Sequence, residues 1–221
     1  YEIYQCDWSS DVCSSDLAAI CDWARAHGAW RIIDEIYLNL SDAQPDGSPA
    51  PTVLAADPGA CVINSFSKYF GMTGWRLGWA VVPEALVPAM ERLAQNYYIC
   101  APTHSQMAAL ACFTPESIAV CEERRQELAA RRALVLQGLA DIGLNVPVLP
   151  DGAFYVYADV GHLTDDSMAL AHRLLATTGV ALAPGVDFDV VDGNRFLRFS
   201  FAGQGADIAS ALERLSTALR T

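Results

Sequence analysis

One stretch of fourteen residues decides the fold: Ser65-Phe66-Ser67-Lys68-Tyr69-Phe70-Gly71-Met72-Thr73-Gly74-Trp75-Arg76-Leu77-Gly78. It begins within an apolar run over residues 61–66 that predicts a strand. Lys68 therefore follows the carboxyl end of a strand, which is where α/β folds bind their ligands. A surface loop with an incidental lysine is the alternative, and an isolated Ser-x-x-Lys would not exclude it.

The groups around this lysine suit a bound phosphate. Ser65 and Ser67 supply hydroxyls, and Arg76 supplies a planar guanidinium that can pair with two phosphate oxygens. Gly71 and Gly74 let the backbone turn closely around an anion. Because all of these groups occur within one run, we interpret the stretch as an anion-binding loop with a reactive amine.

A second motif, Asp34-Glu35-Ile36-Tyr37, also lies at a predicted strand end, 34 residues before Lys68. An aspartate there can keep a pyridine nitrogen protonated, since a full ion pair near 4 Å is worth roughly 4 kcal/mol at an effective dielectric near 20. Tyr37 can donate a hydrogen bond to a ring oxygen. The motif by itself is common. Its position, 34 residues before Lys68, is what supports a functional interpretation.

A third motif is Arg195-Phe196-Leu197-Arg198-Phe199-Ser200-Phe201. Strand alternation places Arg198 on the face opposite Leu197 and Phe199. An arginine in an apolar strand needs an anionic partner, and a substrate carboxylate is one candidate. A structural salt bridge is the alternative, and Arg195 fits that alternative better.

Outward from these motifs, the pattern predicts a two-part chain. Apolar strands over residues 30–33, 61–66 and 77–82 and a helix over 17–27 indicate an α/β layer with a buried sheet. We expect further helices over 83–98, 105–113 and 116–142. Short strands near 152–158, 180–183 and 196–201 then alternate with helices near 167–177 and 206–219. We place the boundary near residue 120, with a partial large domain over 18–120 and a small α+β domain over 121–221.

Composition excludes several classes of function. Acidic residues outnumber basic ones 26 to 14, for a net charge of −12, which argues against a nucleic-acid surface. No apolar run reaches the roughly 20 residues that span a bilayer, and no export signal starts the chain. The seven cysteines form no CxxC pair and the histidines are far apart. We expect a cytoplasmic protein that binds no metal, membrane or nucleic acid.

Together the three motifs resemble the class I/II aminotransferases of fold type I, the aspartate aminotransferase family. The resemblance covers residues 18–221, and the lysine stretch is its most specific part. It extends to Gly152-Ala153-Phe154-Tyr155 and to Ala183-Pro184-Gly185 with Phe188 downstream. It implies an α/β fold consisting of a partial large domain and a small C-terminal domain.

The resemblance also implies roles for individual residues. Lys68 would form the Schiff base with pyridoxal 5'-phosphate (PLP) and then move the proton during transamination. Asp34 would pair with the pyridine nitrogen and Tyr37 with the ring oxygen. Phosphate binding would fall to Ser65, Ser67 and Arg76. Arg198 would bind the α-carboxylate of the substrate. Partners would be an amino acid, a 2-oxo acid and a second copy of the chain.

The chain also departs from the family. An Asn-Pro-x-Gly stretch is expected about thirty residues before Asp34, within residues 1–17, and the sequence there does not contain it. Residues 1–17 instead carry a near-repeat of Cys, Ser and Asp that resembles translated adapter sequence, with a disordered leader as the alternative. The family's cofactor-stacking aromatic residue and glycine-containing phosphate loop are also missing. We therefore expect a truncated fragment.

Three other functions stay open. The same chemistry on PLP would serve a β-elimination lyase, which release of pyruvate and ammonia would reveal. The fold would also serve as a non-catalytic PLP-sensing domain of a transcription regulator, which an upstream DNA-binding module would mark. Finally, the 221 residues could be an inactive fragment of an aminotransferase.

Overall fold

A computed structural model of the chain describes residues 14–219, and they fall into two compact units. One unit comprises residues 14–125 and the other residues 126–219, and each is described by itself. The division lies between Arg125 and Gln126, within helix α4 (Pro115–Asp141). Most of the expected leader, residues 1–13, lies outside the described residues. Residues 14–17 belong to helix α1 (Ser14–Ala26).

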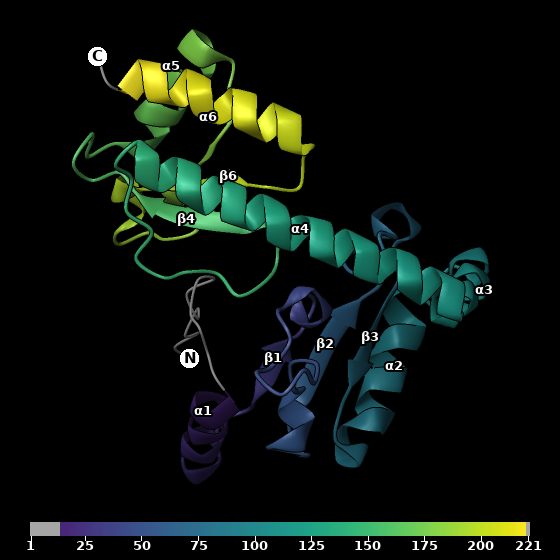
Figure 1. The fold of residues 1–221 in the computed structure, drawn as a ribbon. Coiled ribbons are helices and arrows are strands. Elements are labelled where there is room, and N and C mark those ends of the chain that lie inside the picture. The colour runs from purple at the N-terminus through teal and green to yellow at the C-terminus, as the bar shows by residue number, and fades with distance from the viewer. Residues whose placement is uncertain (1–13, 220–221) are drawn as a thin grey trace. The chain divides into compact units, whose positions relative to one another are not determined.

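The first unit is built on a three-stranded sheet in the order β1 (Ile32–Asp34), β2 (Cys61–Ser65) and β3 (Gly78–Val81). Figure 1 shows the three strands side by side. Strands β1 and β2 are parallel, and β3 runs antiparallel to β2. The carboxyl ends of β1 and β2 and the start of β3 therefore meet at one edge of the sheet.

The expectation of a buried sheet is wrong for one of its faces. Val62 on β2 is buried with Cys21 of α1 and Val53, so helix α1 and the turn Val53–Ala55 cover that face. On the opposite face Ile32 is 65% exposed and Ile63 is 41% exposed. All four residues of β3 are exposed, so the covered face extends over β1 and β2 only. The apolar character of the strands predicted strand formation correctly, but it did not reveal how many faces are covered.

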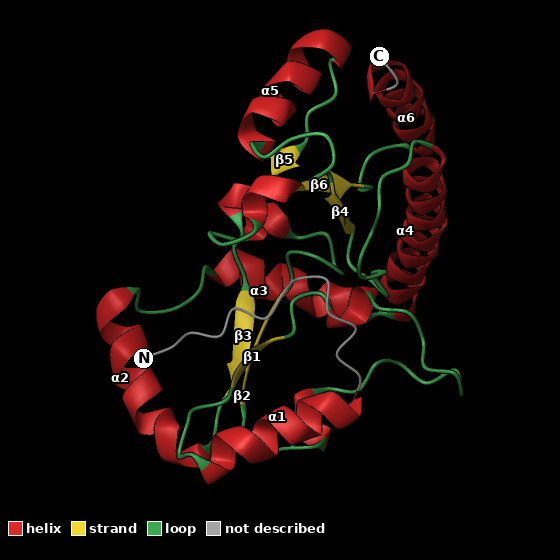
Figure 2. Cartoon of the chain, turned by 90° about the vertical axis from the view of Figure 1, so that its left-hand side faces the viewer, coloured by secondary structure: helices red, strands yellow, loops and turns green. Residues whose placement is uncertain are grey.

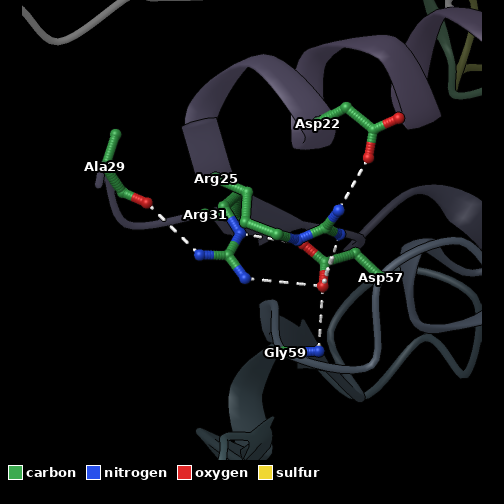
Figure 3. Close-up of polar contacts among 6 residues, drawn as sticks. All are labelled: Asp22, Arg25, Ala29, Arg31, Asp57 and Gly59. Atoms are coloured by element: carbon green, nitrogen blue, oxygen red, sulfur yellow. Dashed lines mark hydrogen bonds and ion pairs between the residues drawn. The ribbon is translucent and has the colours of Figure 1, made fainter. Parts of the chain in front are cut away.

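A buried carboxylate joins α1 to the sheet (Figure 3). Asp57 is 3% exposed and accepts hydrogen bonds from Arg31 Nε (2.8 Å) and from the backbone N–H of Gly59 (3.0 Å). Arg25, in the last turn of α1, lies 3.2 Å from the same carboxylate and 2.7 Å from exposed Asp22. The cluster fixes the connection between α1 and β1 against the loop that leads into β2.

Helices follow the sheet in the predicted order. Helix α2 (Val87–Tyr97) comes after a 3-10 turn over Glu84–Leu86. Helix α3 (Thr103–Leu110) begins two residues earlier than expected, because Pro102 stands at its N-cap and proline is compatible with a helix start. A 3-10 turn over Ala111–Phe113 then leads into α4.

The second unit contains a sheet in the order β4 (Tyr155–Asp159), β6 (Phe196–Ser200) and β5 (Ala183–Pro184), all antiparallel. Its helices are α5 (Ser167–Thr178), α6 (Gly205–Leu219) and the C-terminal part of α4, drawn red beside the yellow strands in Figure 2. The core is made of apolar side chains from all of these helices and from β4 and β6; fully buried members include Leu139, Val156, Leu197 and Leu215.

Candidate active site

Most of the expected site residues of the first unit lie at a single edge of its sheet. Asp34 is the last residue of β1, and Lys68 follows the end of β2 at Ser65. Arg76 precedes the start of β3 at Gly78. Because β1 and β2 are parallel and β3 is antiparallel, these positions share the edge at which ligands bind in α/β folds.

The structure brings Lys68 and Tyr37 together. The Nζ atom of Lys68 lies 5.3 Å from the centroid of the Tyr37 ring, within cation–π range. Tyr37 stands at the N-cap of the 3-10 turn Leu38–Leu40, which follows β1. The amine and the phenol are therefore neighbours although 31 residues separate them in the sequence.

The two serines form one hydroxyl cluster. Ser65 Oγ lies 2.9 Å from Ser67 Oγ and accepts a hydrogen bond from the backbone N–H of Ser67 (3.0 Å). Thr73 Oγ1 donates to the carbonyl of Ser67 (2.8 Å), and Arg76 Nη1 donates to the carbonyl of Thr73 (2.9 Å). The four side chains thus follow one another around the loop, which groups three hydrogen-bonding hydroxyls with a guanidinium.

The backbone of this loop is unusual at two of its residues. Gly71 has a φ of +68°, a left-handed conformation that glycine adopts without strain, as the sequence predicted. Arg76 has a φ of +52° and caps the 3-10 turn Thr73–Trp75. Gly74 does not have a positive φ, and a Cβ added there would meet nothing within 4 Å. A non-glycine residue in the left-handed region often marks a functional constraint.

The two adjacent carboxylates at the end of β1 have different surroundings. Glu35 is buried, accepting hydrogen bonds from Thr52 Oγ1 (2.9 Å) and from the backbone N–H of Val53 (2.7 Å). Asp34 is exposed, and its Oδ1 accepts from the backbone N–H of Ile36 (3.0 Å). The structure therefore assigns Glu35 to the interior and leaves Asp34 as the carboxylate that can face a ligand.

Arg198 lies in the second unit, on β6, between two aromatic rings. Its Cζ atom is 4.1 Å from the ring centroid of Tyr155 and 4.1 Å from that of Phe188. Among residues 14–219 no carboxylate pairs with Arg198, whereas Arg195 pairs with Asp159, as the sequence analysis favoured. The flanking rings leave the edge of the guanidinium, with its N–H groups, as the part suited to an anion.

Sequence reasoning missed several contacts of these residues. Tyr69, next to Lys68, donates a hydrogen bond to Glu122 Oε1 of α4 (2.7 Å), and no pattern links residues so far apart. The rings around Arg198 were also missed, although Phe188 had been noted in its loop. Lys68 is moreover the only lysine in the sequence, a fact that counting would have shown.

Residues 14–219 contain no group of three or more His, Cys, Asp or Glu side chains able to hold a metal ion. Within the same part of the chain, no helix combines the length and the apolar character that crossing a membrane requires.

Comparison with known proteins gives a consistent result. The family model "Aminotransferase class I and II" matches residues 10–215. The valine–pyruvate aminotransferase of Mycobacterium tuberculosis is 46% identical over 203 residues, which are 91% of this chain and 52% of the relative. The aspartate/prephenate aminotransferase of Thermus thermophilus is 34% identical over 205 residues, covering 92% of this chain and 51% of its own.

Solved structures of aminotransferases have the same fold as this chain. The crystal structure of an aminotransferase from Mycobacterium tuberculosis superposes with a TM-score of 0.89 at 45% identity, covering 94% of this chain and 53% of that one. The fold is thus that of fold type I aminotransferases, as the sequence predicted. The chain spans about half the length of the curated relatives it matches.

Proposed function

Because the chain belongs to the class I and II aminotransferases, we propose that it carries the lysine-bearing part of a PLP-dependent site that transfers an amino group from an α-amino acid to a 2-oxo acid. The observation that carries this proposal is the position of Lys68, the only lysine, beside Tyr37 at the ligand-binding edge of the sheet. Since the chain spans about half of its relatives, the activity is proposed for the complete protein.

The residues present fit PLP by their chemistry. An exposed carboxylate, a phenol and an amine at one sheet edge match the pyridine nitrogen, the ring oxygen and the aldehyde; these are Asp34, Tyr37 and Lys68. The hydroxyl cluster of Ser65 and Ser67 and the guanidinium of Arg76 are the kinds of group that donate hydrogen bonds to phosphate oxygens.

When bound, PLP supplies an electron sink for the charge that develops when the substrate's Cα–H bond breaks. Lys68 Nζ would attach the cofactor and, once the substrate amine has displaced it, would take the proton from the substrate's Cα. Asp34 would hold a proton on the ring nitrogen, and Tyr37 would donate a hydrogen bond to the ring oxygen. These steps use only groups at the described edge of the sheet.

Arg198 is proposed to bind the α-carboxylate of the substrate. A guanidinium between two aromatic rings, with no acidic partner among residues 14–219, suits a planar carboxylate that approaches its edge. The similarity to a valine–pyruvate aminotransferase makes valine and pyruvate the first donor and acceptor to test. We further propose a homodimer and a cytoplasmic location, the latter supported by free thiols at the five described cysteines.

The test uses the single lysine. Incubation with PLP followed by borohydride reduction should fix the cofactor on Lys68, and peptide mass mapping should find that adduct in excess of any adduct on the α-amino group. Lys68→Ala should lose both the adduct and the absorbance of lysine-bound PLP. The α-amino group is the only other amine, and its adduct serves as an internal reference.

Two results would contradict the proposal. One is an adduct confined to the α-amino group with Lys68 unmodified. The other is a complete protein that takes up PLP on Lys68 but forms no alanine from valine and pyruvate or from any other amino acid and oxo acid. Ammonia and pyruvate release from cysteine in that case would favour the lyase.

A further inference from the structure

The loop that carries Lys68 is anchored on both sides by apolar residues. Phe66 and Met72 are buried together with Ala109 and Cys112, and the backbone N–H of Met72 donates to the carbonyl of Phe66 (3.0 Å). These contacts hold the ends of the loop. They do not reach Lys68 itself, which stands near the middle of the loop.

The middle of the loop is held by a hydrogen bond to a distant helix. Tyr69, the residue after Lys68, donates its hydroxyl to Glu122 Oε1 at 2.7 Å. Its ring also packs edge-on against Phe70, with centroids 5.0 Å apart. The carbonyl of Lys68 also accepts a hydrogen bond from the backbone N–H of Gly71 (3.0 Å), so the loop fixes its own backbone there, while Tyr69 ties this part of the loop to a carboxylate of α4.

The same carboxylate is tied to the segment that carries Tyr37. Its second oxygen accepts from Arg125 Nε at 2.9 Å, and Arg125 Nη1 lies 3.5 Å from the carbonyl of Ser41. Ser41 caps the 3-10 turn Leu38–Leu40, whose backbone N–H at Leu40 donates to the carbonyl of Tyr37 (2.8 Å). Glu122 thus connects the two segments whose side chains meet as Lys68 and Tyr37.

Electrostatics keep this connection in one protonation state near neutral pH. Burial, and next the hydrogen bond to Glu122, raise the pKa of Tyr69. Burial raises the pKa of Glu122, but the hydrogen bonds from Tyr69 and Arg125 outweigh it, so that this pKa is lowered. A neutral phenol therefore donates to an ionised carboxylate, which is among the stronger kinds of hydrogen bond.

We propose that Glu122 is a positioning residue which, through Tyr69 and Arg125, holds the Lys68 amine beside the Tyr37 ring. An ion pair between Glu122 and Arg125 alone, three residues apart on a half-buried helix face, would contribute little. What distinguishes this carboxylate is that two other segments of the chain converge on it. The use of Lys68 for catalysis rests on the proposed function, but the positioning itself does not.

The experiment observes Lys68 directly. Reductive methylation with ¹³C-formaldehyde labels Lys68, the only lysine, together with the α-amino group, which is recognised by its lower pKa. The methyl resonances of Lys68 should be displaced by the ring current of Tyr37, whose centroid lies 5.3 Å from Nζ, and Tyr37→Leu in the same 221-residue chain defines the undisplaced value. No cofactor or activity is needed.

Tyr69→Phe, which removes only the hydroxyl, and Glu122→Ala should both move the Lys68 resonances toward the Tyr37→Leu value. Glu122→Gln keeps an oxygen acceptor for Tyr69 and should move them less. The matched control is Glu127→Ala, because Glu127 pairs with Arg131 (2.6 Å) on the same helix but, among the described residues, makes no hydrogen bond or ion pair with either segment. It should leave the resonances in place.

Resonances that stay displaced in both Tyr69→Phe and Glu122→Ala would overturn the proposal, as would an equal movement in the Glu127→Ala control. If Tyr69→Phe does not fold, Glu122→Gln and Glu122→Ala decide the question. PLP that fails to attach to Lys68 while the resonances respond as expected would refute the cofactor role and leave the positioning intact.

Discussion

Asp57 shows how one residue can hold two elements together. Its side chain is 4% exposed and faces two guanidinium groups, those of Arg31 and Arg25. The hydrogen bond from Arg31 lowers the pKa of Asp57 most, and burial acts in the opposite direction. The backbone N–H of Gly59 and the guanidinium of Arg25 lower this pKa further, to about 2. A carboxylate with this environment contributes to stability only while it is ionised.

This predicts a pH dependence for the first unit. The folded-state pKa lies below the unfolded value of about 3.9, so the contribution is fully present above pH 4 and is lost as the pH falls through about 2. Asp57→Asn should lower the free energy of unfolding by about 2 kcal/mol at pH 7, with the difference vanishing near pH 2. Urea denaturation at several pH values measures it.

Asp22 provides the control, because it contacts the same Arg25 from an exposed position. Asp22→Asn should change the free energy of unfolding by well under 1 kcal/mol. Equal losses for the two variants would show that burial of Asp57 is not what matters.

At the scale of elements, a close backbone approach determines where Phe188 lies. The 3-10 turns Gly185–Asp187 and Gly193–Arg195 touch, and a Cβ at Gly185 would meet the carbonyl oxygen of Gly193 and lie 2.8 Å from that of Phe196. Only glycine permits this contact. Phe188 follows the turn Gly185–Asp187 directly, so the position of this turn determines how the Phe188 ring lies against the guanidinium of Arg198.

Gly185→Ala should therefore push the turn away, because backbone atoms cannot yield as a flexible side chain can. We expect a loss of about 1–3 kcal/mol in the free energy of unfolding, the usual cost of overpacking. The Nε–Hε NMR resonance of Arg198 should also shift, since the Phe188 ring moves. Gly203→Ala, where the added Cβ meets nothing within 4 Å, should change neither quantity.

At the scale of the whole molecule, exposed apolar side chains and a high net charge oppose each other. The first unit exposes large apolar residues from its sheet and helices; they include Ile32, Ile63, Val81, Leu93 and Met107. Such patches favour association, while a net charge of −12 resists it by mutual repulsion. Salt screens that repulsion.

We therefore expect the chain to self-associate, and more strongly as salt rises from 0.05 to about 0.5 M, where the screening length is only a few ångströms. The double substitution Ile32→Thr and Ile63→Thr should weaken association in sedimentation velocity, because both side chains lie on the open face of the sheet. Val190→Thr, 96% exposed outside the sheet, is the control. Association unaffected by the sheet variant would locate the contact elsewhere.

The sequence by itself determined the order of the elements, the strand ends that carry Asp34 and Lys68, and the alternation that buries Leu197 and Phe199 beside Arg198. These follow from periods of two and 3.6 residues and from turn-forming residues, which are local properties of a chain.

Only the tertiary structure decided which neighbours those residues have. It buried Glu35 and left Asp34 exposed, joined Tyr69 to Glu122, placed two rings on Arg198 and left one sheet face exposed. The physical reason is that such contacts join segments tens of residues apart. Their formation depends on how whole elements pack, and local propensity carries no information about that.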